Sequence, residues 1–139
     1  MAEEKDWLVL KRVSGGSPEI VSVVRAIPSA DIRGRFPVRM EVAWGYEALP
    51  NGLPTEKELV RGRTIYAELD RIVGGNGVHA MTKTGDGGRT MYYYITNIEP
   101  LREALLRYFD SQPPLSVKVS TLPDPHWSAL QCVLDGVRQ

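Results

Sequence analysis

Alternating apolar and polar positions predict three β-strands in the first third of the chain. Residues 7–13 form a β-rich run, and residues 19–26 form another after a turn cluster at 14–18, which together predict a hairpin. Between residues 38 and 44, apolar side chains alternate with charged or small ones, as in a half-buried strand. The segment 27–36 contains a proline, a glycine and two arginines, so we expect a loop there.

A long amphipathic helix is predicted next. Residues 59–73 place apolar side chains at a spacing near 3.6. The preceding Thr55-Glu56-Lys57-Glu58 fits a capping box, in which Thr55 and Glu58 satisfy each other's backbone donors. Gly62 interrupts this helix at a cost of about 1 kcal/mol relative to alanine. We therefore expect Gly62 to permit close packing on the sheet.

The second half of the chain predicts a hairpin, a helix and a last strand. Residues 78–84 and 89–96 are expected to be strands joined by a glycine-rich turn. Asn97 is a candidate cap for a helix that Pro113-Pro114 ends. Residues 115–120 then alternate between apolar and polar side chains, as expected for a strand.

A short helix is predicted at the end of the chain, over residues 124–136. Asp124 would occupy the cap and Pro125 the first helical position. Trp127 is expected one turn into this helix, on an apolar stripe that pins it to the sheet. Cys132 falls among the apolar residues of the stripe, so we expect a buried side chain with no catalytic role.

The order of elements predicts the fold class. From residue 37 onward it is strand, helix, strand, strand, helix, strand, the split βαβ pattern of a ferredoxin-like fold. We predict one α+β domain over residues 1–139, with an antiparallel sheet and two helices on one face. Its parts would be an edge hairpin at 7–26, a core at 37–120 and the terminal helix. An unrelated α+β meander is the main competing interpretation.

This fold assigns the strand residues to two faces. The face toward the two helices should carry Val38, Met40, Val42, Val78, Ala80, Met91, Tyr93, Ile95, Val117 and Val119. The opposite face should carry Arg39, Glu41, His79, Met81, Lys83, Tyr92, Tyr94 and Lys118. Three interpretations of the second face stay open. The last helix covers it through Trp127, or it binds a protein, or its aromatic rings stack on RNA bases.

Composition narrows the functional classes. The 139 residues include 17 Lys+Arg and 17 Asp+Glu, and this zero net charge argues against binding through a bulk field to nucleic acid or membranes. Acidic residues gather at 1–6 and at the start of the long helix, whereas arginines gather between residues 25 and 39. With one cysteine and no signal peptide or apolar span, a reducing cytoplasmic setting is expected.

No motif in the chain predicts a specific catalytic chemistry. His79 and His126 do not have the spacing of metal ligands, and we expect no metal ion or other cofactor. The glycine-rich segments join strands or end a helix, so they are turns rather than phosphate loops. The candidate binding surface consists of Arg89, Tyr92, Tyr94, His79, Asp124 and Trp127.

Two short motifs in this set carry a family resemblance. Gly87-x-Arg89 with Tyr92-x-Tyr94, and later Asp124-Pro125-x-Trp127, resemble signatures of the bacterial family catalogued as domain of unknown function 695. That family is similar in layout to the ribonuclease-E-regulating protein B family. The resemblance implies a cytoplasmic ferredoxin-like domain, possible regulation and no established catalysis. This chain departs from the family after Trp127, where Ala129 stands instead of a tyrosine.

Three hypotheses about function follow. The first is a non-catalytic interaction or regulatory module with a protein partner, for which a homodimer is one form. The second is a small-molecule-binding or enzymatic domain with a pocket near Tyr92, Tyr94, His79 and Arg89. The third is nucleic-acid binding on the open sheet face, which predicts an affinity that falls steeply with salt.

Overall fold

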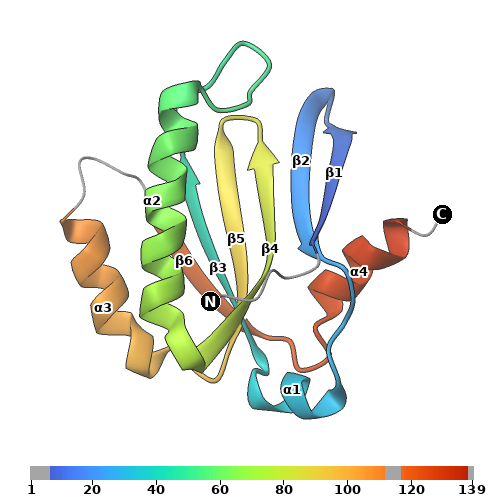
Figure 1. Ribbon diagram of the computed structural model, residues 1–139, viewed down its shortest axis with the longest axis vertical. Coiled ribbons are helices and arrows are strands. Elements are labelled where there is room, and N and C mark those ends of the chain that lie inside the picture. Colours follow the sequence, from blue (N-terminus) through green and yellow to red (C-terminus); the bar gives the residue numbers. More distant parts are fainter. Residues whose placement is uncertain (1–6, 112–116, 138–139) are drawn as a thin grey trace.

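The computed structural model describes residues 7–111 and 117–137. Within these residues six strands form one antiparallel sheet, in the order β1-β2-β4-β5-β3-β6, and four α-helices accompany it (Figure 1). The strands are β1 (Trp7–Ser14), β2 (Ser17–Val24), β3 (Val38–Gly45), β4 (Gly77–Gly85), β5 (Gly88–Ile95) and β6 (Val117–Pro123). The helices are α1 (Ala30–Arg35), α2 (Glu56–Val73), α3 (Glu99–Asp110) and α4 (Ser128–Val137), with a 3-10 turn η1 (Gly74–Asn76) after α2. The α+β class is therefore as predicted.

Both predicted hairpins are present. β1 and β2 pair antiparallel, and β2 pairs with β4, so this hairpin extends the sheet at one end. β4 and β5 are joined by Asp86 and Gly87, which both have positive φ. That backbone suits the twist of a tight hairpin. Three features named in the sequence lie outside the described residues: the acidic segment 1–6, the helix-ending Pro113-Pro114 and Leu115 of the expected last strand.

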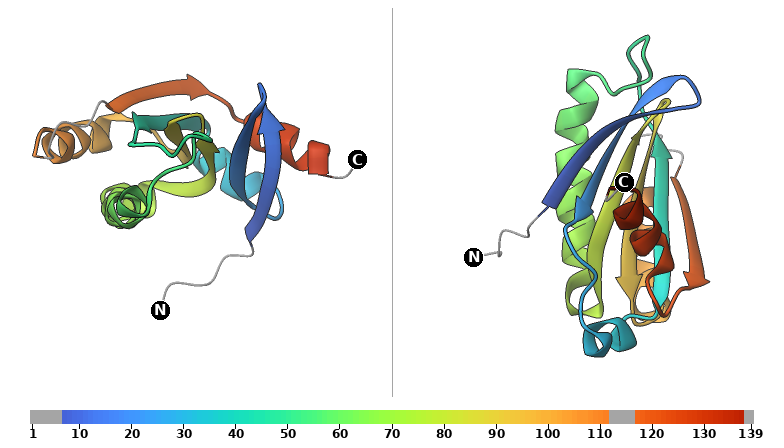
Figure 2. Two further views of the ribbon diagram at one scale, coloured as in Figure 1. Left: turned by 90° about the horizontal axis from the view of Figure 1, so that it is seen from above. Right: turned by 90° about the vertical axis from the view of Figure 1, so that its right-hand side faces the viewer.

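The sheet carries a hydrophobic core on each face. α2 and α3 lie on one side and α4 lies on the other (Figure 2). The core under α2 and α3 contains Met40, Val42, Trp44, Ile65, Leu69, Val73, Met91, Tyr93, Ile95, Leu101 and Leu105. The core under α4 contains Val21, Val23, Phe36, Ala80, Met81, Tyr94, Trp127, Leu130, Val133 and Leu134. The predicted alternative in which the last helix covers the second face is thus realised over Tyr94.

The first turn of α2 has half of the predicted capping box. The Thr55 hydroxyl accepts a hydrogen bond from the Glu58 N–H at 3.4 Å, as predicted. The reciprocal bond was predicted wrongly, because the Glu58 carboxylate accepts from the Glu47 N–H at 2.6 Å instead. The Thr55 N–H already donates to the Glu47 carbonyl. Glu58 therefore ties the loop before α2 to the helix.

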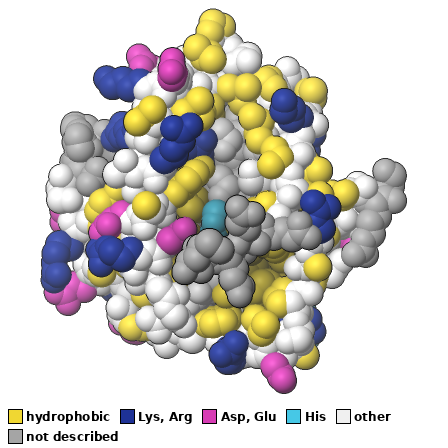
Figure 3. All heavy atoms as spheres, in the orientation of Figure 1, with side chains coloured by type: hydrophobic (Ala, Val, Ile, Leu, Met, Phe, Trp, Pro, Cys, Tyr) yellow, Lys and Arg dark blue, Asp and Glu magenta, His cyan; other side chains and the backbone are white. Residues whose placement is uncertain are grey.

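The expected loop at residues 27–36 contains a short helix, α1. Its start is capped by the Ser29 hydroxyl, which accepts from the Ile32 N–H at 3.5 Å. A helix of six residues is too short for periodicity to reveal. One of the arginines that gather between residues 25 and 39 has a local partner, since Arg33 donates to the Pro28 carbonyl. Figure 3 shows Lys and Arg side chains spread over the α2 side of the molecule rather than gathered in one patch.

A bulge in β4 overturns part of the predicted face assignment. The pairing of β4 with β5 shifts between His79 and Met81, so Ala80 is an extra residue. One inserted residue reverses the alternation on its N-terminal side. Val78 and Ala80 therefore pack on the α4 side and His79 lies on the α2 side, opposite to the prediction. Met81 lies on the α4 side as predicted.

The terminal helix begins later than predicted, at Ser128 rather than near Asp124. Residues 125 and 126 form a turn. Trp127 has φ of 56°, which is outside the right-handed helical region. The Asp124-Pro125 pair thus introduces a turn, not the first turn of the helix.

Candidate functional site

The Asp124 carboxylate connects three elements on the α4 side of the sheet. Oδ2 accepts hydrogen bonds from the Tyr94 hydroxyl of β5 at 2.7 Å and from Arg39 Nη1 of β3 at 3.0 Å. Oδ1 accepts from the Ser128 N–H at 2.7 Å, and Oδ2 from the Ala129 N–H at 3.2 Å. Asp124 is buried. It therefore caps α4 through its side chain and fastens the helix to the sheet.

The ionisation states of this cluster are set by the same contacts. Burial disfavours the Asp124 carboxylate, but hydrogen bonds from Tyr94, the backbone of Ser128 and Ala129, and Arg39 outweigh it and hold its pKa below the usual value. Burial, together with the hydrogen bond to Asp124, raises the pKa of Tyr94 well above its ordinary value. Near neutral pH the carboxylate is ionised and the phenol is neutral. Neither group is poised to exchange a proton.

Trp127 anchors α4, as its position after the Asp-Pro pair predicted. Its ring is buried and stacks on Tyr94, with centroids 4.1 Å apart and planes 6° from parallel. Its Nε1–H donates to the Phe36 carbonyl at 3.0 Å. Because Trp127 covers it, the Tyr94 ring does not present that face to a base or a ligand.

Tyr92 lies two residues earlier on β5 and is only half-buried. The Lys83 ammonium stands 5.3 Å from the centre of its ring, within cation–π range. Burial raises the pKa of Tyr92, and the nearby Glu41 carboxylate adds to this effect. Of the two tyrosines predicted to line the binding surface, only Tyr92 keeps part of its side chain exposed.

His79 lies on the α2 side, within an aromatic cluster. Its ring centroid is 5.0 Å from that of Tyr93 and 5.1 Å from that of Trp7. Its Nε2 is 2.7 Å from the Thr82 hydroxyl and 3.2 Å from the Met81 carbonyl. The imidazole is therefore held in place by its neighbours rather than directed outward.

Arg89 is buried between β5 and α2. Its Nε donates to the Thr84 hydroxyl at 3.0 Å, and its guanidinium lies 5.0 Å from the centre of the Tyr66 ring. A Cβ atom at Gly62 would overlap Arg89 Nη1. The predicted close packing at Gly62 is therefore packing against this side chain.

The six predicted binding residues do not form one surface. Tyr92, Tyr94, Asp124 and Trp127 lie on the α4 side, whereas His79 and Arg89 lie on the α2 side. The bulge in β4 explains why His79 lies on the α2 side, and the alternation of side chains along β5 explains why Arg89 does. The predicted pocket shared by Tyr92, Tyr94, His79 and Arg89 therefore has no common opening.

A surface that the motifs did not predict lies between α3 and β6. It is a groove of about 420 Å³ lined by Ile98, Arg102, Leu105, Leu106, Phe109, Asp110, Val117, Val119 and Thr121. We call this groove, together with β6, the β6 surface. The sequence offered one sign of this groove. Leu106 is an apolar residue that lies outside the buried stripe of its helix, next to the buried Leu105.

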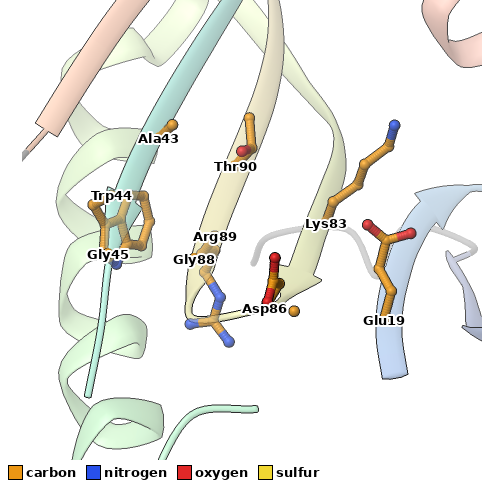
Figure 4. A pocket seen from close by; sticks show the side chains of 10 residues that line it. Glu19, Ala43, Trp44, Gly45, Lys83, Asp86, Gly88, Arg89 and Thr90 are labelled. Carbon is orange, nitrogen blue, oxygen red and sulfur yellow. The ribbon is translucent and has the colours of Figure 1, made fainter. Parts of the chain in front are cut away.

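A second hollow, of about 440 Å³, lies at the β4–β5 turn. Figure 4 shows its lining from β2, β3, β4 and β5, with Lys83 and Glu19 on neighbouring strands and the Arg89 guanidinium directed toward the end of the strands. Glu19 is already paired with Arg12 at 2.6 Å. The hollow is shallow and mixes cations with carboxylates, so it indicates no single ligand charge.

Three further observations concern metal-binding clusters, the single cysteine and membrane-spanning helices. No cluster of three or more His, Cys, Asp or Glu suited to a metal ion occurs in residues 7–111 and 117–137. Cys132 is exposed, contrary to the prediction, because it lies on the outer side of α4 away from Leu130 and Leu134. None of the helices in the described segments has the length and apolarity needed to cross a membrane.

Comparison with known proteins assigns no relatives to this chain. No family model, no curated protein and no solved structure matches it.

Proposed function

We propose that this protein is a non-catalytic interaction module that associates with a second copy of itself through the β6 surface. The observation that carries the proposal is an edge strand with an apolar groove directly beside it.

The strand β6 is the more accessible of the two sheet edges. Within the described residues it pairs with β3 alone, so its outer N–H and C=O groups lack a partner strand. Six of its seven residues are exposed, and Lys118 is its only charged residue. Unprotected edges of this kind are templates for pairing with another strand. The opposite edge, β1, carries Lys11 and Arg12, which oppose such pairing.

Exposed apolar side chains extend the surface on both sides of the strand. Leu106 of α3 is 61% exposed, and Val119 and Leu122 of β6 are 39% and 51% exposed. Burying apolar area is the main favourable contribution to association. A strand added to β6 would place its alternate side chains over the groove.

The charges at the groove rim favour a second copy as the occupant. Arg102 and Asp110 each lie four residues from Leu106, one on each side along α3. Antiparallel pairing of β6 with its copy places a two-fold axis perpendicular to the sheet, with the two α3 helices antiparallel. With the axis near Leu106, each Arg102 lies opposite the Asp110 of the other copy. A closed two-fold interface requires such self-complementarity.

Sedimentation velocity over a range of protein concentrations tests this proposal. The wild-type chain should shift toward a dimer as concentration rises. Val119→Lys should weaken association, because two lysines then meet near the axis. The matched control is Val9→Lys on β1, where the side chain is also exposed. A wild-type chain that stays monomeric, or an equal effect of both variants, contradicts the proposal.

Reversal of the rim charges tests the register. Arg102→Asp should weaken the dimer, because it places an aspartate opposite Asp110 of the other copy. Adding Asp110→Arg should restore association by re-forming the pair with opposite polarity. The double variant would stay monomeric if the two helices do not meet in this register.

The proposed architectural and cellular context is that of a cytoplasmic ferredoxin-like domain. Support for the fold comes from the core strand order β4-β5-β3-β6 with α2 and α3 on one face. The motifs that resemble domain of unknown function 695 include Asp124 and Trp127, which hold α4 in place. A regulatory role fits this proposal, since a dimer interface of this kind lets one copy control another.

A further inference from the structure

Arg89 is a buried cation without an anionic partner. The side chain is 7% exposed. Within residues 7–111 and 117–137, none of the ion pairs includes Arg89. Burying an uncompensated charge is costly, and proteins almost always pair such groups. This guanidinium therefore has an unmet requirement for a negative charge.

The protein contacts of Arg89 leave its terminal nitrogens uncommitted. Nε donates to Thr84, and the flat face of the guanidinium lies over Tyr66. Neither Nη1 nor Nη2 donates a hydrogen bond to the described part of the chain. These atoms are also not among the fully enclosed polar atoms that lack a partner, so they retain contact with solvent. The guanidinium thus keeps donors that have no partner in the described part of the chain and retain some contact with solvent.

Three groups near the guanidinium are neutral or already satisfied. The Tyr46 hydroxyl donates to the Gly52 carbonyl at 2.8 Å. Burial raises the pKa of Tyr66 to about 12, against the opposing effect of Arg89, so this phenol is neutral near pH 7. Glu58, one turn before Gly62 on α2, is engaged with the Glu47 N–H. None of these groups neutralises Arg89.

The local sequence maintains this arrangement at a cost. Gly62 is the position where α2 approaches the guanidinium, and a side chain there would overlap Nη1. Glycine within a helix costs about 1 kcal/mol relative to alanine. The helix therefore leaves room for the guanidinium at this position.

We propose that Arg89 is the anchor of a binding site for a small oxyanion, a carboxylate or phosphate group, at the end of the β4–β5 hairpin beside α2. The guanidinium fork matches two oxygens of such a group in one plane. Tyr66 covers the flat face and fixes the fork, so the ligand approaches its edge. The guanidinium is directed toward the end of the strands, where its terminal nitrogens retain contact with solvent (Figure 4).

Titration with sodium phosphate and with sodium acetate tests this site, each at constant ionic strength maintained with sodium chloride. A specific ligand raises the unfolding temperature in a saturable manner. Arg89→Lys keeps the charge but removes the fork, and should weaken the apparent affinity by about tenfold, the equivalent of 1.4 kcal/mol. The matched control is Arg63→Lys at an exposed position of α2, which should leave the titration unchanged.

The Arg89 Nε–H resonance in the NMR spectrum of the wild-type protein gives a second measurement that needs no variant. It should shift saturably with phosphate or acetate, and the anion that saturates identifies the source of the oxyanion. If neither anion gives a saturable shift, the site does not exist. If Arg89→Lys and wild type titrate alike, the anion binds elsewhere and the proposal is overturned.

Discussion

Gly62 on α2 lies directly against the guanidinium of Arg89 on β5. A Cβ atom at residue 62 would overlap Nη1, so the guanidinium or the helix would have to shift. The guanidinium is held from two further directions, by the Thr84 hydroxyl and by the Tyr66 ring. This contact determines how close α2 can lie to the sheet.

Gly62→Ala should destabilise the protein, although alanine is the better helix former. Overpacking at a buried contact costs about 1–3 kcal/mol, which exceeds the gain in helix propensity of about 1 kcal/mol. Urea denaturation measures the change in unfolding free energy. Gly136→Ala on α4 is the control, since its Cβ would meet no atom within 4 Å, and it should be neutral or stabilising.

Arg89→Ala combined with Gly62→Ala tests the mechanism of that effect. Removing the guanidinium removes the overlap, so Gly62→Ala should cost much less in the Arg89→Ala background. A double-mutant cycle gives this coupling directly. Additive effects of the two substitutions would show that the contact is not the cause.

The hairpins and the long helix were predictable because their determinants are local. The Thr55 cap, the glycine-rich β4–β5 turn and the alternation in β3 each lie within a few residues of the structure they specify. The β4 bulge was not predictable, because Ala80 continues the alternation that begins at Val78 and His79 and leaves no visible break in the pattern. The face assignment of His79 failed for this reason alone.

Asp124→Asn should destabilise the protein by about 2 kcal/mol at pH 7, because it removes a buried charge from the Arg39 pair and weakens the bond from Tyr94. The folded-state pKa of Asp124 lies below its ordinary value, so its ionised form contributes stability above that ordinary value. This contribution is lost as the pH falls through the lowered folded-state pKa.

Urea denaturation of both proteins between pH 7 and strongly acidic pH measures this dependence. The difference in unfolding free energy between wild type and Asp124→Asn should shrink toward the acidic end. Glu41→Gln serves as the comparison, since Glu41 also pairs with Arg39 but is more exposed. A difference that stays constant across this range would show that the charge of Asp124 is not what stabilises α4.

Tyr94→Phe and Tyr92→Phe form a matched pair two residues apart on β5. Tyr94→Phe removes the hydroxyl bonded to the buried Asp124 and should cost about 1 kcal/mol of unfolding free energy. Tyr92 is half-buried, and its hydroxyl makes no comparable bond to Asp124, so Tyr92→Phe should change stability little. Equal effects measured by thermal unfolding would contradict the anchoring role of Tyr94.

Cys132 should react with a thiol reagent in the native protein. Its side chain is exposed on α4, so modification should proceed without prior unfolding. A colorimetric disulfide-exchange assay in the absence and presence of urea compares the two rates. Protection of the native thiol would instead support the buried position that the helical spacing predicted.

The components of the candidate sites were visible in the sequence, but their grouping was not. Asp124 and Trp127 stood out as a motif, yet their partners Tyr94 and Phe36 are distant in the chain. The β6 surface depends on which side of α3 and β6 stays uncovered, which is a property of strand order. Pairings between residues far apart in sequence require the fold before they can be assigned.

Amide hydrogen exchange at β6, followed at low and high protein concentration, tests the central claim most directly. The N–H groups on the outer edge of β6 should become protected as concentration rises, because each then bonds to the strand of a second copy. The outer N–H groups of β1 provide an internal reference and should exchange equally fast at both concentrations. Exchange at β6 that does not depend on concentration would contradict self-association through this strand.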